Sequence, residues 1–109
     1  MKNTKTDCLF CKIINWEIES QLVYEDDEVI AIKDIHPQAP VHILLIPRKH
    51  IPGLTRLTEE DRALIGHIYL VANQIAKDQS VFQCGFRLVA NSGPDAGQVI
   101  NHLHFHFRR

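Results

Sequence analysis

Apolar and polar side chains alternate strictly near the end of the chain. Residues 101–108 read NHLHFHFR, so His102, His104 and His106 occupy every second position with apolar residues between them. A β-strand sends successive side chains to opposite faces. We therefore predict a strand that buries its apolar row and offers three imidazoles to a cleft, although a solvated face of an edge strand fits the same alternation.

Shorter apolar stretches predict the rest of a sheet. Residues 22–25 and 29–32 are strand-like runs on either side of the acidic turn 26–28, which predicts a hairpin. The run HILLIP at 42–47 indicates a buried strand that ends at a proline. Residues 86–90 predict a further strand, so five strands are expected in all.

Helical spacing appears in two places. Residues 9–18 predict a short helix or turn, and apolar residues recur at helical spacing over about 59–79. Thr58, with Asp61 three residues later, resembles a capping box at the start of that long helix. Turn residues predict a loop at 91–98. The pattern predicts an α+β fold with a mostly antiparallel sheet, one long helix and a short N-terminal helix.

Length and charge narrow the class of protein. The chain has 109 residues and no internal repeat or linker, which predicts a single domain, 1–109. Its 12 basic and 13 acidic residues give a net charge of -1, without the basic footprint of a protein that binds nucleic acid or a membrane. No apolar run approaches the roughly 20 residues needed to cross a bilayer, and residues 1–7 lack the apolar core of a signal peptide. We expect a cytoplasmic protein.

The three cysteines do not form a disulfide framework, because their number is odd. Cys8 and Cys11 form a Cys-x-x-Cys pair, which indicates metal or redox chemistry or is incidental. No βαβ pattern surrounds the pair, which disfavours a thioredoxin-like site. Cys84 is expected to be a small buried apolar residue.

Several stretches resemble the histidine-triad (HIT) family, and within it the Hint branch of nucleoside phosphoramidases. The stretches are LFCKIINWEI, KDIHPQAPVHILLIPRKHI, the long helix, and RLVANSGPDAGQVINHLHFHF. This resemblance covers nearly the whole chain. It implies the HIT-like fold and the hydrolysis of purine nucleoside 5'-phosphoramidates through a covalent nucleotidyl-histidine intermediate.

The resemblance assigns a role to each of four histidines. A neutral imidazole can attack phosphorus, and the phosphoramidate that forms is labile to water; in the family the middle histidine of the triad does this, here His104. His106 is implied to contact the phosphate and the leaving group, and the carbonyl of His102 to orient the nucleophile. His42 is implied to lie near the phosphate oxygens, where donors stabilise developing charge. Without the resemblance, a satisfied histidine at the start of a strand is the alternative interpretation of His42.

The same resemblance implies a nucleotide-binding set. Asp34 would accept hydrogen bonds from the ribose hydroxyls, although an aspartate before a His-Pro turn is also typical of a turn cap. The loop residues of the set are implied to lie beside the phosphate, where small residues let backbone amides approach an anion. The set consists of Leu9, Phe10, Asp34, Ile35, Asn91, Gly97 and Gln98.

A second constellation provides metal ligands. Cys8, Cys11, His50 and His102 supply the four nitrogen and sulfur ligands that a tetrahedral structural zinc requires. Several bacterial proteins that this chain resembles carry such a site, with the first histidine of the triad as the fourth ligand. The implied phosphoramidase chemistry needs no metal, so the zinc would be structural.

The chain departs from the family near its end. Val99 stands where Hint-type proteins commonly carry a hydroxyl or polar side chain, which weakens the expectation for amine leaving groups. The family continues beyond the position of Arg109 into a tail near the partner subunit's site. Arg108 and Arg109 are expected to be a solvated terminus, with contact to the acidic part of the substrate as the alternative. Two alternatives follow: a dinucleoside polyphosphate hydrolase of the Fhit type, or a nucleotide- or zinc-binding module without turnover.

The resemblance also implies a homodimer with a purine nucleotide as its substrate. In such a dimer the long helix and a neighbouring strand meet their copies, and the two sheets join into one of ten strands. The apolar stripe Ile68, Val71 and Ile75 on the long helix is compatible with that interface, but it is equally compatible with the core.

Overall fold

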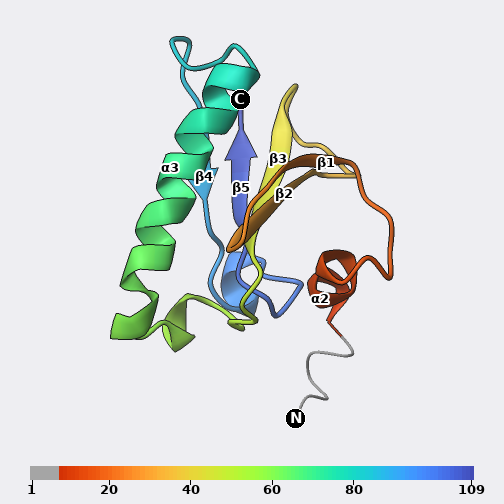
Figure 1. The fold of residues 1–109 in the computed structure, drawn as a ribbon, viewed down its shortest axis with the longest axis vertical. Coiled ribbons are helices and arrows are strands. Elements are labelled where there is room, and N and C mark those ends of the chain that lie inside the picture. Colours follow the sequence, from red (N-terminus) through yellow and green to blue (C-terminus); the bar gives the residue numbers. More distant parts are fainter. Residues whose placement is uncertain (1–7) are drawn as a thin grey trace.

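A computed structural model describes residues 8–109, whose strands form one antiparallel sheet (Figure 1). The order across the sheet is β1-β2-β3-β5-β4. The strands are β1 (Leu22–Glu25), β2 (Val29–Lys33), β3 (His42–Pro47), β4 (Arg87–Val89) and β5 (Phe105–Arg108). The predicted α+β fold with a five-stranded sheet, including the hairpin of β1 and β2, is confirmed.

The helices follow the predicted pattern with shorter bounds. They are α2 (Leu9–Ile14), the 3-10 turns η1 (Leu54–Arg56) and η2 (Glu59–Asp61), the long helix α3 (Arg62–Asp78), and η3 (Pro94–Ala96) within the predicted loop. The capping box is present: a carboxylate oxygen of Asp61 accepts the backbone N–H of Thr58 at 2.9 Å. Within residues 8–109, no helix is long and apolar enough to cross a membrane.

Two apolar clusters cover the two faces of the sheet. On one face, Ile68, Val71 and Ile75 of α3 are each at most 3 % exposed, so this stripe is core. On the other face, Phe10 of α2 packs with alternate residues of β2 and β3. Figure 1 shows α3 and α2 on different sides of the strands. The sheet is therefore sandwiched between a long helix and a short one, and the short one leaves part of its face open.

The prediction of a strand through all three triad histidines is wrong in its first half. Pairing with β3 begins only at Phe105, and residues 101–104 form a bend before the ladder. The Leu103 N–H donates to the Ile51 carbonyl at 2.6 Å, which ties this bend to the loop after β3. The apolar row is nevertheless buried as predicted, because Leu103, Phe105 and Phe107 all join the cluster beneath α3.

The prediction for Cys84 is also wrong. This cysteine is exposed, in the turn that follows α3. The chain reverses direction there through residues with left-handed backbone, Ser80 (φ 60°) and Gly85 (φ 108°). The turn projects Cys84 away from the core instead of burying it.

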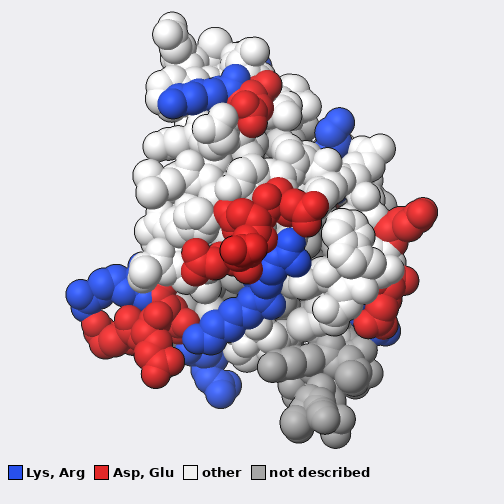
Figure 2. All heavy atoms as spheres, in the orientation of Figure 1, with Lys and Arg blue, Asp and Glu red and all other residues white. Residues whose placement is uncertain are grey.

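Charged side chains mix on the surface. Figure 2 shows acidic and basic groups next to one another on one face. Ion pairs join Arg48 to Glu25 and Arg62 to Glu59. Because charges of both signs alternate there, that face has no extended patch of a single sign, in agreement with the net charge of -1.

Candidate active site and metal centre

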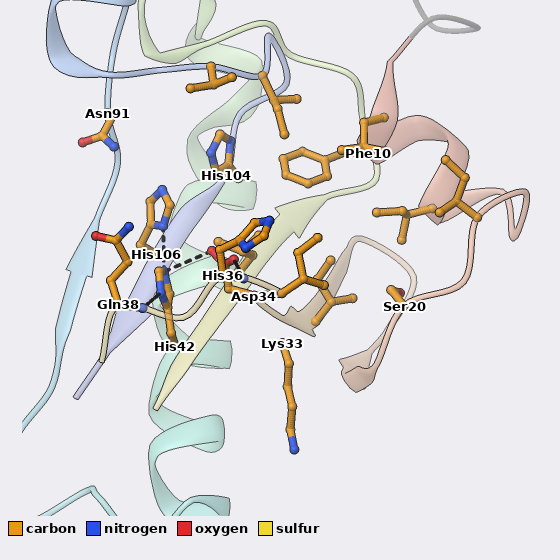
Figure 3. A pocket seen from close by; sticks show the side chains of 18 of the residues that line it. Phe10, Ser20, Lys33, Asp34, His36, Gln38, His42, Asn91, His104 and His106 are labelled. Atoms are coloured by element: carbon orange, nitrogen blue, oxygen red, sulfur yellow. Dashed lines mark hydrogen bonds and ion pairs between the residues drawn. The ribbon is translucent and has the colours of Figure 1, made fainter. Parts of the chain in front are cut away.

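A cavity of about 510 Å³ lies between α2 and the sheet (Figure 3). Its volume falls within the range of small-molecule binding sites. Most of the predicted catalytic and nucleotide-binding residues line it, although they come from segments far apart in the sequence. Those residues are Leu9, Phe10, Asp34, Ile35, His42, Asn91, Gly97, His104 and His106.

His104 lies at the inner wall of this cavity, immediately before β5. Its Nδ1 is 2.7 Å from the backbone carbonyl of His102. A carbonyl only accepts, so Nδ1 carries the hydrogen and the lone pair of the neutral ring is on Nε2. The Phe10 ring contacts the imidazole edge-on at a centroid distance of 5.0 Å and helps to fix its orientation. The imidazole of His104 therefore has a fixed orientation, and its Nε2 is available to attack an electrophile.

His42 and His106 form a hydrogen-bonded pair across β3 and β5. The Gln38 backbone N–H donates to Nδ1 of His42 at 3.0 Å, so that neutral ring carries its hydrogen on Nε2. His42 Nε2 then donates to Nδ1 of His106 at 2.9 Å. The remaining nitrogen of His106 must carry a hydrogen. This relay, drawn with dashed lines in Figure 3, turns His106 into a neutral donor beside His104.

Burial keeps these imidazoles neutral. Desolvation lowers the pKa of His106 to about 4, with further lowering from the charges of His104, Arg108 and His42. Desolvation likewise lowers the pKa values of His42 and His104, although the hydrogen bond to the His102 carbonyl acts in the opposite direction on His104. Near neutral pH the cavity therefore contains a lone-pair nucleophile and neutral donors.

Asp34 combines the two functions that the sequence left open. One carboxylate oxygen accepts the backbone N–H of His36 at 2.8 Å and caps the turn after β2. The other lies 3.4 Å from Nε2 of His42, at the cavity wall. Asp34 therefore shapes the loop and still presents an acceptor to a bound molecule.

The far end of the cavity is apolar. Ile13 and Ile18 follow Phe10 along the α2 segment, and Ile32 and Leu44 come from β2 and β3. These four side chains were missed as site residues. Their signal is the strand alternation, since Ile32 and Leu44 face the side of the sheet opposite α3. An apolar recess next to polar groups fits a planar ring attached to a polar ligand.

The predicted metal ligands meet outside this cavity. One ligand atom from each of Cys8, Cys11, His50 and His102 lies within 4.8 Å of the other three. Nδ1 of His102 is 3.3 Å from the Cys8 sulfur and 3.6 Å from the Cys11 sulfur. Nδ1 of His50 is 3.2 Å from both the Cys11 sulfur and Nδ1 of His102. Three segments thus converge on one point.

These spacings fit a tetrahedral ion. Bonds of about 2.0–2.1 Å to nitrogen and about 2.3 Å to sulfur give edges of about 3.3 Å between nitrogens and about 3.6 Å between nitrogen and sulfur. Nε2 of His102 also lies 2.8 Å from the Pro47 carbonyl and must carry the hydrogen. The lone pair of His102 therefore points from Nδ1 into the cluster, as a metal ligand requires. The residues present could hold a metal ion such as zinc.

Comparison with known proteins identifies relatives of this arrangement. A family model described as "Scavenger mRNA decapping enzyme C-term binding" matches residues 7–109. An uncharacterized HIT-like protein from Synechocystis sp. is 51 % identical over 100 residues, which cover 92 % of this chain and 87 % of that protein. The chain belongs to the histidine-triad (HIT) family.

Solved HIT structures have the same fold. A HIT family hydrolase from Legionella pneumophila is 39 % identical, with a TM-score of 0.93 over 94 % of this chain and 92 % of that one. A histidine triad protein from Clostridium difficile is 45 % identical, also with a TM-score of 0.93, over 99 % of this chain and 92 % of that one. The predicted HIT-like fold is thereby confirmed.

Two residues of the predicted nucleotide-binding set, Gln98 and Gly97, make hydrogen bonds that stabilise their own loop. The Gln98 side chain does not line the cavity; its Nε2 donates to the carbonyls of Pro52 and Ile100, and its Oε1 accepts the Gly93 N–H. The Gly97 amide donates to Pro94 at 3.0 Å, so it serves the turn and is not directed at an anion. Gly97 is required by its left-handed φ of 87°. Both residues hold the loop that carries Asn91 and Val99.

The triad histidines divide between two sites in this HIT chain. His106 and His104 line the cavity, whereas the ring of His102 is fully buried in the cysteine cluster. Arg108 was expected to be solvated, but it lines the cavity, with its Nε 3.4 Å from Nε2 of His42. Its position at the end of β5, two residues after His106, follows from the same alternation that predicted the triad.

Proposed function

We propose that this HIT protein hydrolyses purine nucleoside 5'-phosphoramidates through a covalent nucleotidyl-His104 intermediate. The hydrogen bond of 2.7 Å from His104 Nδ1 to the His102 carbonyl carries the proposal, because it leaves Nε2 as the nucleophile. The neutral donor His106 next to it suits a developing phosphoryl charge. Hydrolase chemistry agrees with the description of the Legionella pneumophila relative.

The reaction proceeds in two displacements at phosphorus. Nε2 of His104 attacks, the new P–N bond forms, and the bond to the amine breaks as the leaving nitrogen takes up one proton from solvent. Water then attacks the phosphorus of the nucleotidyl-histidine, the bond to Nε2 breaks, and the proton that the water loses returns to solvent, so no net proton is consumed. The products are the nucleoside monophosphate and the free amine, and His104 returns to its neutral form.

The cavity supports one orientation of the nucleotide. The purine lies in the apolar recess between Phe10 and Ile35, and the ribose hydroxyls donate to the carboxylate of Asp34. The phosphate then lies at the other end, near His106 and Asn91. Both ends of the cavity are occupied in this arrangement, and the phosphorus lies in front of His104.

We further propose a structural zinc at Cys8, Cys11, His50 and His102. It would join α2 to the loop after β3 and to the bend before β5, without a role in bond breaking. The fit of the ligand spacings to tetrahedral edges supports this assignment.

We also propose a homodimer, formed through α3 and β4. Among the described residues 8–109, β4 pairs only with β5 and lies at the edge of the sheet. On α3, Tyr69 and Leu70 are exposed to 53 % and 67 %, outside the buried stripe. An open strand edge beside exposed apolar side chains is typical of a surface that pairs with a copy of itself.

The decisive experiment measures release of a fluorescent amine from an adenosine 5'-phosphoramidate. His104→Ala should reduce the rate on the order of 10³-fold or more, because the nucleophile is lost. The control is AMP binding by calorimetry, which the variant should retain. If the wild-type protein binds AMP but releases no amine, the phosphoramidase proposal fails.

Val99 favours a second candidate function. This side chain lines the cavity, is 88 % exposed and has no hydroxyl for a leaving amine. A phosphate leaving group needs no such donor, so dinucleoside polyphosphates are the alternative substrates. The same assay with diadenosine polyphosphates separates the two, since Val99→Ser should raise the rate on phosphoramidates and leave the rate on polyphosphates unchanged.

A further inference from the structure

His102 connects the cysteine cluster to the catalytic nucleophile. Its ring is completely buried, with Nδ1 facing the sulfur atoms and Nε2 donating to the Pro47 carbonyl at 2.8 Å. Its own carbonyl accepts the Nδ1 hydrogen of His104 at 2.7 Å. The imidazole and the carbonyl of one residue therefore serve two different sites.

The backbone around His102 has few other anchors. The ladder between β3 and β5 begins at Phe105, so residues 101–104 lack its hydrogen bonds. The Leu103 N–H donates to the Ile51 carbonyl at 2.6 Å. The His102 carbonyl belongs to the same planar peptide unit, so this hydrogen bond restrains its direction from one side of His102. The restraint on the other side, which a sheet would supply in a strand, comes from the hold on the His102 side chain.

The cysteine cluster restrains the His102 side chain. A metal ion bound at Nδ1 of His102 would add a bond to a ring whose Nε2 already donates to Pro47. When the cluster is loaded, meaning that it holds a metal ion, the His102 ring therefore cannot rotate. Cys8 and Cys11 lie at the start of α2, which also positions Phe10 against the His104 ring. A loaded cluster therefore restrains His104 twice, through the carbonyl of His102 and through Phe10.

We infer that metal loading of the cysteine cluster controls turnover by positioning His104 through His102. The inference rests on the proposed nucleophilic role of His104 and on the proposed zinc. His102 acts here as a positioning residue, since its ring does not line the nucleotide cavity. Removal of the metal should lower kcat more than it lowers nucleotide affinity, because Asp34 and the recess residues of β2 and β3 lie on the sheet side of the cavity and only the Phe10 side of the recess belongs to α2.

A metal ion bound at the cysteine cluster can be removed without unfolding the protein. A second cavity of about 330 Å³ opens onto Cys11 and His50, between Arg48 and Asn15. Small chelators can therefore reach the ligand atoms without unfolding the sheet. His50→Ala offers an independent route, because His50 touches the cluster but lines no part of the nucleotide cavity.

The test compares metal-loaded, chelator-treated and His50→Ala protein, with Cys84→Ser as the matched control outside the cluster. Metal content is measured first, and the Nδ1–H resonance of His104 is followed in protein with ¹⁵N-labelled histidine, identified by its loss in His104→Ala. We expect emptying to broaden or remove that resonance and to lower kcat by about tenfold or more, while AMP affinity and far-UV circular dichroism persist.

The possible failures are distinguishable. An unchanged His104 resonance and kcat after metal removal would overturn the inference, as would a purified protein that binds no metal at this cluster. If the loaded protein hydrolyses no phosphoramidate, the proposed function fails, but the response of the His104 resonance to metal still decides the coupling. Re-addition of zinc should restore the resonance to chelator-treated protein and not to His50→Ala.

Discussion

Trp16 occupies a backbone position that favours glycine. It follows α2 with a left-handed φ of 64°, its N–H donates to Ile13, and the next N–H, of Glu17, donates to Lys12. These two bonds form a Schellman motif, in which glycine is the usual residue because a Cβ is strained there. The indole itself is 66 % exposed, so little burial offsets that strain.

Trp16→Gly should therefore be more stable than Trp16→Ala. Both variants lose the indole, but only glycine relieves the left-handed backbone, and the expected difference is about 1 kcal/mol in the free energy of unfolding. Chemical denaturation followed by circular dichroism measures it, since the chain contains one tryptophan and fluorescence is lost in both variants. Equal stabilities would show that the turn relaxes without a left-handed residue.

The triad shows which residue roles can be predicted from sequence. Alternation correctly predicted that Phe105 and Phe107 are buried, because the apolar side of a strand has no alternative to the core. It was wrong about His102, whose ring turns toward the cysteines, because a residue just before the ladder is free of the strand period. Gln98 is a second example: one of its three hydrogen bonds goes to the Pro52 carbonyl, a distant contact that no local pattern encodes.

At the scale of elements, hydrogen bonds of Asp26 connect the β1–β2 turn to α3. One oxygen accepts the N–H groups of Glu28 and Val29, and the other lies 2.6 Å from both the Tyr24 hydroxyl and Nε2 of His67. Burial alone would raise the pKa of Asp26, but these hydrogen bonds outweigh it and lower the pKa from 3.8 to about 2. The ionised carboxylate is thus favoured by folding.

Low pH should weaken the contacts of Asp26, because they depend on its ionised carboxylate. Because the pKa of Asp26 is lower in the folded state, its stabilisation is complete above about pH 4 and is lost as the pH falls through about 2. Asp26→Asn should cost about 1 kcal/mol at neutral pH, a modest value for a side chain that is 25 % exposed. It should also flatten the dependence of the unfolding free energy on pH between about 4 and 2.

The matched control for that titration is Asp27→Asn. It removes the same charge from the exposed neighbouring residue in the turn. Urea unfolding of the three proteins across this pH range separates the specific contact from the general effect of charge. Identical pH profiles for both variants would contradict the role of Asp26.

Element boundaries were predictable where local chemistry decides them. The strand at His42–Pro47 agrees with its prediction, since an apolar run that ends in proline has one reasonable interpretation. Residues 9–18 were expected to form a short helix or turn, and they form a helix to Ile14 followed by a turn. The point at which the helix ends was not predictable, because Trp16 adopts a backbone conformation that propensity assigns to glycine.

At the scale of the whole molecule, the two edges of the sheet differ. β1 and β4 are both edge strands, and each exposes a potential pairing surface. Beyond the buried stripe, α3 adds the exposed Leu70 and Tyr69, and β4 packs with Phe107 on β5 in the same cluster beneath α3. The proposed dimer accordingly uses the β4 edge, where helix and strand present apolar surface together.

Leu70→Glu should disrupt that dimer, whereas Leu22→Glu should not. Both substitutions place a carboxylate on an exposed leucine, 67 % exposed on α3 and 40 % exposed on β1. A charge buried in the interface without a partner should raise the dimer dissociation constant by at least about tenfold, or about 1.4 kcal/mol. Sedimentation equilibrium of the three proteins measures this directly. Disruption by Leu22→Glu alone would move the interface to the β1 edge, and a wild-type monomer at every concentration would contradict the dimer.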